Sequence, residues 1–326
     1  MHRITQTLVA TILLQLTLCA AGNEPKQTVR VIYLVSADRE ENREYTAAVE
    51  HAIRDIREWY GKQLGGPTFR LSDPVVEVVK SKQNGDWFYA NPNGRQADNW
   101  GFNNTLQEAR RLLGAKFNDP DHVWVLYSDG PGDKGRGGNG VTCLPENDLL
   151  GLLGKHPKQK NKLRWIAGLG HEIGHAFGLP HPADTKKDAD AIMWTGIYGK
   201  YPDNTYLTES DKKILSRSRF FFHLDGRPVF QPGEVVSRIS YSGGAFEQLD
   251  GPNPVYWQES KSNGSSGFIF EELRRDKKFV YIHDAARKLT IRLPVSGGRS
   301  FLSRNEGKTW QPLYTVEPPR PAVRHP

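Results

Sequence analysis

The sequence predicts a mixed α/β (α+β) domain with a twisted sheet over residues 23–224, followed by a small all-β sandwich or jelly roll over residues 225–317. The chain has 326 residues, which is long for one domain of average size and suits two. Strand-like and helix-like runs alternate in the first part, whereas short alternating runs separated by turns fill the second. Residues 1–22 are typical of an export signal, and residues 318–326 of a disordered tail.

Composition excludes several classes of protein. Hydrophobic residues make up 37% of the chain, and 8 Trp, 12 Tyr and 14 Phe supply a packed core, so overall disorder is excluded. The 32 Gly and 21 Pro are not periodic, which excludes a collagen-like chain. The net charge of +7, from 44 basic and 37 acidic residues, is modest for this length. We therefore expect no nucleic-acid partner.

The start of the chain predicts export. A short basic segment precedes an apolar run over residues 8–18, and small residues suited to signal-peptidase cleavage follow. A lipid anchor on Cys19 is the alternative to plain cleavage. No later segment reaches about 18 apolar residues, so no transmembrane segment is expected. After cleavage Cys143 is the only cysteine, which excludes an internal disulfide and favours a bacterial protein that is secreted, periplasmic or on the cell surface.

Hydrophobic spacing predicts the elements of the first part. Nearly continuous β-branched runs indicate buried strands at Thr28–Val35 and residues 122–127, and residues 75–79 alternate as a third strand. Apolar residues in steps of three and four predict an amphipathic helix over residues 42–62. Three further helices are expected from an Asn104 cap to Leu113, over residues 163–177, and over residues 208–222.

A Gly-rich loop over residues 128–140 leads to Val141–Leu144, which we expect as a short edge strand. The unpaired side of an edge strand can align an extended peptide by backbone hydrogen bonds. This segment is therefore the candidate strand for a peptide substrate.

The run HEIGHAFGLPH, which begins at His171, carries the chemistry. Positions four apart lie on one face of a helix, so His171 and His175 project side by side and can bind one Zn²⁺. Gly178 can adopt a positive φ that ends the helix, which lets His181 return as a third ligand. Three histidines leave a fourth position open for water, the arrangement of catalytic sites, and Glu172 at the border of the face can reach that water.

This run, followed by a methionine at Met193, resembles the metzincin clan of zinc metalloproteases and is closest to its matrixin-like branch. The resemblance covers about residues 28–222. It departs from other branches because Thr195 stands two residues after Met193 and Pro182 follows His181. The resemblance implies zinc ligands at His171, His175 and His181, a general base at Glu172, and a Met-turn at Met193 beneath the imidazoles.

Calcium is a second candidate cofactor. Asp129 and Asp133 in the Gly-rich loop resemble the structural ion-binding loop of matrixins. Carboxylates suit Ca²⁺, so Asp184, Asp188 and Asp190 are a further candidate group. Ordinary solvated loops are the alternative in both places.

Two sequence features in residues 225–317 allow predictions. Residues 303–310, SRNEGKTW, resemble a single Asp-box with Asn305 in the Asp place, which predicts a structural hairpin turn. Tyr256, Trp257 and Trp310 can stack on sugar rings and so contact a glycan, or can belong to the core.

The sequence therefore predicts a secreted zinc-dependent endopeptidase acting on protein or peptide substrates, with Glu172 as general base. A non-catalytic adhesin or glycan-binding protein with a structural zinc is one alternative. A zinc hydrolase acting on a non-peptide amide or ester is another. The intact Glu172 speaks against the adhesin, because a structural site has no use for a carboxylate in that place.

Overall fold

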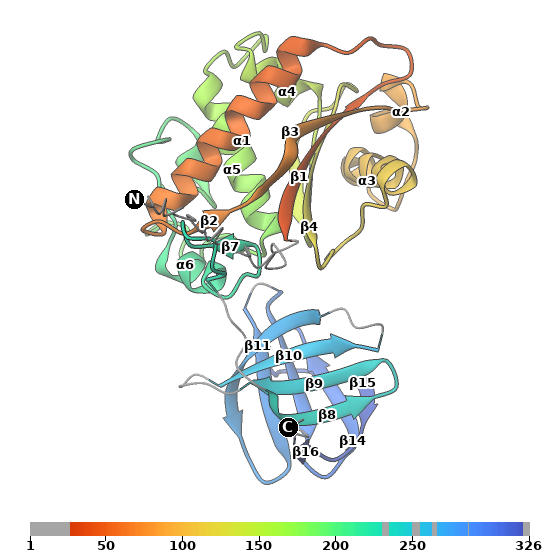
Figure 1. Ribbon diagram of the computed structural model, residues 1–326, viewed down its shortest axis with the longest axis vertical. Helices are drawn as coiled ribbons and strands as arrows, with labels where there is room; N and C mark the ends of the chain where they lie inside the picture. The colour runs from red at the N-terminus through yellow and green to blue at the C-terminus, as the bar shows by residue number, and fades with distance from the viewer. Residues whose placement is uncertain (1–26, 230–234, 250–254, 263–265, 286, 322–326) are drawn as a thin grey trace, which may run out of the picture.

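The computed structural model describes residues 27–229, 235–249, 255–262, 266–285 and 287–321 (Figure 1). The predicted export signal, Cys19 included, lies outside these residues. Across the described ranges, no helix combines the length and the apolar character that a membrane span requires.

The first part of the described chain is built on a five-stranded sheet in the order β3-β1-β4-β6-β5. All neighbouring strands run parallel except β5, which is antiparallel to β6. The strands are β1 (Thr28–Val35), β3 (Leu71–Lys80), β4 (His122–Ser128), β5 (Arg136–Gly138) and β6 (Val141–Leu144). The three strands predicted from hydrophobic spacing are confirmed. The expectation that Val141–Leu144 forms the edge is wrong, because the Gly-rich loop itself supplies the edge strand β5.

Helices cover both faces of this sheet, which explains the nearly continuous apolar run of β1. Val31 and Tyr33 pack in one core with α1 (Arg43–Gln63) and α5 (Lys162–Ala176). Ile32 and Leu34 face the opposite core, beside α2 (Gly85–Ala90) and α3 (Trp100–Leu113).

Two of the predicted helices have different boundaries. Helix α3 begins at Trp100, one turn before Asn104, so Asn104 is not a cap. Its buried amide instead donates to the carbonyls of Trp87, Phe88 and Asn91, which ties α3 to α2. Helix α6 (Glu209–Leu215) has the expected capping box at Thr208, but it ends well before residue 222.

Several short elements were not predicted. Strand β7 (Phe221–Phe222) occupies the end of the segment expected as helix and pairs with β2 (Thr68–Phe69). Helix α4 (Glu146–Leu152) follows β6, and single turns of 3-10 helix lie at Ala97–Asn99 and Thr195–Ile197. These elements are too short to show a hydrophobic period.

The second part is one sheet that closes on itself. Successive antiparallel strands run from β8 to β15, and Val316 pairs with Tyr241 to join β15 to β8. The predicted all-β character is confirmed, but the sandwich is wrong: the described strands form a barrel instead of two packed sheets. The strands are β8 (Val235–Tyr241), β9 (Gly244–Leu249), β10 (Tyr256–Lys261), β11 (Ser266–Arg275), β12 (Phe279–Asp284), β13 (Leu289–Pro294), β14 (Gly298–Ser303) and β15 (Gln311–Val316).

The barrel revises three expectations about its end and its aromatic residues. Arg320–Pro321 pairs with β8 as β16, so part of the predicted disordered tail is ordered. Trp257 is 1% exposed and belongs to the barrel core, which excludes it from stacking on a sugar. Arginines lie over the rings of the two other candidates, Arg217 over Tyr256 and Arg292 over Trp310.

The Asp-box segment forms the predicted turn between β14 and β15. The Asn305 side chain accepts from the Thr309 N–H and donates to the Thr309 hydroxyl. The Ser303 hydroxyl accepts from the Gly307 N–H. These bonds act within the turn, which agrees with a structural role.

Charged residues in and just after α6 join the two parts of the chain. Arg217 and Lys213 pair with Glu271 of β11 at 2.7 and 3.2 Å. The barrel therefore lies against the end of the first part that carries α6 (Figure 1).

Candidate metal centre

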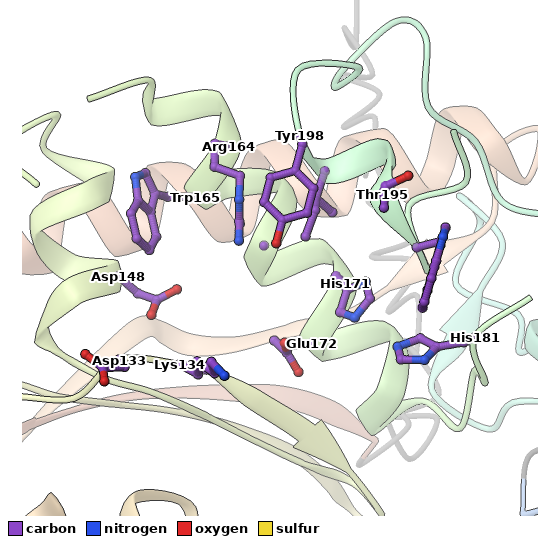
Figure 2. Close-up of a pocket in the computed structure, with 14 residues that line it drawn as sticks. Asp133, Lys134, Asp148, Arg164, Trp165, His171, Glu172, His181, Thr195 and Tyr198 are labelled. Atoms are coloured by element: carbon purple, nitrogen blue, oxygen red, sulfur yellow. The ribbon is translucent and has the colours of Figure 1, made fainter. Parts of the chain in front are cut away.

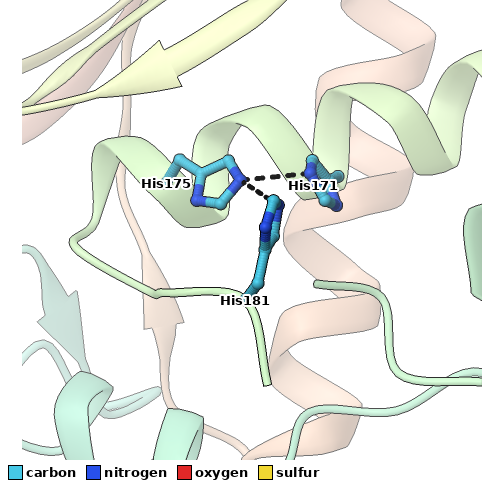
Figure 3. A group of neighbouring side chains, drawn as sticks. All are labelled: His171, His175 and His181. Carbon is cyan, nitrogen blue, oxygen red and sulfur yellow. Dashed lines mark hydrogen bonds between the residues drawn. The ribbon is translucent and has the colours of Figure 1, made fainter. Parts of the chain in front are cut away.

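Helix α5 and the turn after it bring the three predicted histidines together. The Asn161 side chain caps the helix by accepting from the Leu163 N–H. Gly178 has φ 95°, a conformation that favours glycine, and it directs the chain back toward the helix. His171 and His175 project from one face of α5, and His181 approaches them from the returning chain (Figure 3).

The reactive nitrogens of the three rings converge. The Nε2 atom of His175 lies 3.1 Å from Nε2 of His171 and 3.1 Å from Nε2 of His181. The Nδ1 atoms of His171 and His175 lie 2.8 Å from the backbone carbonyls of Ile192 and Leu179. A carbonyl only accepts, so each Nδ1 carries the proton and each facing Nε2 presents a lone pair.

Lone pairs held this close repel each other unless a cation lies between them. Four ligands at about 2.0–2.1 Å around tetrahedral Zn²⁺ lie about 3.3 Å apart, close to the separation of these nitrogens. Among the described residues, His171, His175 and His181 are the one group of three or more candidate ligand side chains that converge. The donor set therefore fits a metal ion, and imidazole suits zinc.

The surroundings also keep the imidazoles neutral, the form that binds a metal. Burial, helped by the neighbouring His175, lowers the pKa of His171 to about 4. Burial lowers the pKa of His175 and of His181 as well, and the charge of Lys288 on the barrel adds to the effect at His181.

Met193 packs against the helix that carries two of these histidines. The residue is fully buried, and a Cβ atom placed on Gly174 would lie 2.5 Å from its sulfur. Gly174 stands between the two helical histidines, so its missing side chain lets Met193 approach α5. Trp194, which the motif did not single out, packs edge-on against His181 with ring centroids 5.2 Å apart.

The carboxylates expected for calcium do not converge in the described residues. Asp129 instead accepts hydrogen bonds from the Tyr33 hydroxyl and from the Ser36 N–H and hydroxyl. Asp184 accepts from two backbone amides in its own turn, Asp188 accepts from Tyr206, and Asp190 pairs with Lys200.

Glu172 lies one residue beyond His171 and faces a pocket (Figure 2). Burial raises the pKa of its carboxyl to about 7, although the Gly137 N–H donates to it and the charges of Arg136 and Arg164 lower it. A carboxylate with a pKa near neutrality can both take and return a proton.

The edge strand touches the helix backbone beside Glu172. A Cβ atom on Gly137 would lie 1.9 Å from the Glu172 carbonyl oxygen, whereas one on Gly138 would meet nothing within 4 Å. We expect Gly137→Ala to lower the free energy of unfolding by about 1–3 kcal/mol and to reduce any hydrolytic activity, because β5 must move away from α5.

Gly138→Ala is the matched control for this prediction, and it is expected to change the stability by less than about 0.5 kcal/mol. Urea unfolding of both variants provides the measurement. Equal stability of the two variants would contradict the close contact between β5 and α5.

The pocket next to the histidines has a volume of about 420 Å³. Residues from several elements line it, and those missed from the sequence include Asp148, Arg164, Trp165 and Tyr198. Arg164 stands seven residues before His171, which places it on the same face of α5, so helical spacing alone could have found it. Asp148 lies in the short helix α4 and carried no sequence signal.

Asp148 is a buried acid. It is 6% exposed, and burial, followed by the charge of Glu172, raises its pKa from 3.8 to about 7. Between these two values the folded chain holds a proton that the unfolded chain has released, so Asp148 lowers stability increasingly as pH rises from about 4 to 7. One unit of pKa difference corresponds to about 1.4 kcal/mol.

We therefore expect Asp148→Asn to be more stable relative to the unaltered chain at pH 8 than at pH 4, by a few kcal/mol, because the asparagine has no proton to lose. Denaturant unfolding of chelator-treated protein at both values gives the difference. A stability difference that does not vary with pH would contradict the raised pKa.

No protein-family model matches the chain, and no curated protein matches it in sequence. Its fold is similar to crystal structures of OgpA from Akkermansia muciniphila. The wild-type protein is 16% identical in one crystal form, with 90% of this chain and 94% of that chain covered and a TM-score of 0.43. In a second crystal form it is 15% identical, with 96% of this chain and 100% of that chain covered and a TM-score of 0.44. Catalytically inactive OgpA in complex with an O-glycopeptide (glycodrosocin) substrate is 14% identical. The match covers 92% of this chain and 96% of that chain, with a TM-score of 0.43.

Proposed function

We propose that this chain is a zinc-dependent endopeptidase in which His171, His175 and His181 hold the metal and Glu172 is the general base. The observation that carries the proposal is the convergence of three neutral Nε2 atoms beside a carboxyl whose pKa is about 7. The open pocket next to them gives a substrate access to both.

Each residue then has a defined task. Zinc at the three histidines would polarise the scissile carbonyl and make water a stronger nucleophile. Glu172 takes a proton from the attacking water and returns it to the leaving nitrogen. The carbonyls of Ile192 and Leu179 hold the first two imidazoles in the tautomer that presents Nε2.

The edge strand provides the place for an extended substrate. In the described sheet, β5 pairs on one side with β6 and contacts α5 at Glu172. A peptide added along β5 would lie next to the general base and form backbone hydrogen bonds. This takes over the role first given to Val141–Leu144.

The same proposal includes the matrixin-like metzincin assignment and the export signal over residues 1–22. It also includes the domain boundaries at residues 224 and 317. The path of His181 after Gly178 and the position of Met193 below α5 support the assignment. Export agrees with the single cysteine of the cleaved chain, Cys143, which is free and buried.

The test is cleavage of an unfolded casein-like protein by purified, zinc-loaded chain, with the products identified by mass spectrometry. We expect internal peptide bonds to be cut, the activity to disappear with a chelator, and zinc to restore it. Hydrolysis of esters or non-peptide amides alone would favour a different zinc hydrolase. A zinc-loaded chain that hydrolyses none of these substrates would favour a structural site and overturn the proposal.

A further inference from the structure

We propose that the pocket beside Glu172 is a specificity pocket in which Asp148 and Arg164 select a neutral group that both donates and accepts hydrogen bonds. This inference rests on the proposed peptidase function and adds the class of substrate to it. Two sources share this chemistry: the carboxamide of an Asn or Gln side chain, and the hydroxyl groups of a sugar attached to Ser or Thr.

Asp148 forms one side of the pocket. Its carboxyl is directed from α4 into the pocket toward Glu172, although the residue is 6% exposed (Figure 2). Within the described ranges it has no ion-pair partner within 4.0 Å, and no other residue's side chain donates a hydrogen bond to it. The one hydrogen bond to the Asp148 carboxyl comes from its own backbone N–H, which leaves the buried group incompletely paired. Incomplete pairing of a buried carboxyl is costly, and a bound donor would reduce that cost.

Arg164 forms the opposite side and is held in place by its neighbours. A Cβ atom on Gly168 would lie 2.7 Å from an Nη atom of Arg164, so the missing side chain lets the guanidinium lie along α5 toward His171. Its centre lies 4.5 Å from the Tyr198 ring and 5.4 Å from the Trp165 ring. Aromatic contacts use the faces of a guanidinium and leave the N–H groups on its edge for a ligand.

Trp165 gives the pocket a rigid wall. Its indole N–H donates to the Gln159 carbonyl, and a Cβ atom on Gly151 would lie 2.1 Å from its ring. The indole therefore has a satisfied donor and a fixed position. A ligand meets the ring surface of Trp165 and not its polar edge.

The charges of the pocket exclude most simple side chains. Asp148 and Arg164 line the same space but, in the described structure, form no ion pair within 4.0 Å. A cationic side chain could pair with Asp148 but would be repelled by Arg164 and leave it unpaired, and an anionic one could pair with Arg164 but would be repelled by Asp148 and Glu172. An apolar side chain would displace water from both groups without replacing its hydrogen bonds. Polar groups left unpaired in this way discriminate strongly against an apolar substrate. A group that donates to Asp148 and accepts from Arg164 satisfies both.

The test is a series of peptides that differ at one position next to a cleaved bond: Gln, Asn, Leu, Lys, Glu, Ser, and Ser carrying a single sugar. We expect kcat/KM for a carboxamide or the glycosylated Ser to exceed that for Leu, Lys and Glu by at least about 10-fold. Whichever of the carboxamide and glycosylated peptides has the higher kcat/KM identifies the source of the recognised group. Mass spectrometry confirms that the same bond is cut in every peptide.

Variants assign the preference to the two residues. We expect Asp148→Asn and Arg164→Gln each to reduce the ratio of kcat/KM between the preferred peptide and the Leu peptide by at least about 10-fold. Exposed Asp203→Asn and Arg110→Gln are the matched controls and should leave the ratio unchanged. Zinc content and thermal unfolding of each variant separate a changed preference from a failure to fold.

The outcomes distinguish this inference from the proposed function. Cleavage of all peptides at similar rates, or a preference for Leu, would overturn the specificity pocket and leave the peptidase in place. If no peptide is cleaved, the proposed function falls, and peptide binding followed by tryptophan fluorescence tests the pocket alone. Equal affinity for the Gln, glycosylated Ser and Leu peptides would then overturn the inference.

Discussion

Glu172→Gln is expected to lower kcat/KM for peptide cleavage by about 10²- to 10⁴-fold, the usual contribution of a general base. The amide keeps the size of the side chain but cannot take a proton from water. The Glu172 carboxyl is suited to that transfer because burial raises its pKa to about 7. Steady-state kinetics on one cleaved peptide measure the loss.

The zinc content of this variant makes the prediction specific. The three histidines contact each other and backbone carbonyls without Glu172, so Glu172→Gln should still hold one zinc per chain. Glu40→Gln, at an exposed position before α1, is the control and should retain full activity. Full activity of Glu172→Gln would remove Glu172 from the mechanism. Loss of zinc together with loss of activity would indicate that Glu172 is a zinc ligand.

His175→Ala is expected to abolish both zinc binding and peptide cleavage. His175 is central to the group, because its Nε2 atom lies 3.1 Å from the Nε2 atoms of both other histidines. An ion present at about 1,000 times its Kd stabilises the folded chain by about 4 kcal/mol. For a domain of this size, that corresponds to a decrease of about 10 °C in Tm when the ion is lost.

Thermal unfolding with and without a chelator checks this prediction. The chelator should lower the Tm of the unaltered chain by about 10 °C and leave the Tm of His175→Ala unchanged. His51→Ala, at an exposed position on α1, should behave like the unaltered chain. A chelator effect of equal size in His175→Ala would mean that the stabilising ion binds elsewhere.

The parts of the fold that could be predicted from sequence are those with a strong local signal. β1 is found at Thr28–Val35 as expected, because a β-branched run buried on both faces has few alternatives. The helix that carries His171 and His175 is found as expected, because the four-residue spacing of these histidines and the glycine that ends the helix agree. The convergence of the histidines follows from helical spacing and the turn at Gly178.

The missed parts depend on contacts between distant segments. Asn104 has the chemistry of a cap, but its buried amide satisfies carbonyls at the end of α2. The alternating strands of the second part suit a sandwich or a barrel equally well, and only the pairing of Val316 with Tyr241 decides between them. Asp148 joins the pocket because α4 packs against α5, a contact that no local pattern encodes.

X-ray absorption and anomalous diffraction at the zinc edge test the central claim most directly. We expect one zinc per chain, bound by Nε2 of His171, His175 and His181 at about 2.0–2.1 Å, with the Glu172 carboxyl close by but not bound. Metal-replete, folded protein without zinc at these nitrogens, or with Glu172 as a direct ligand, would contradict the proposed catalytic site.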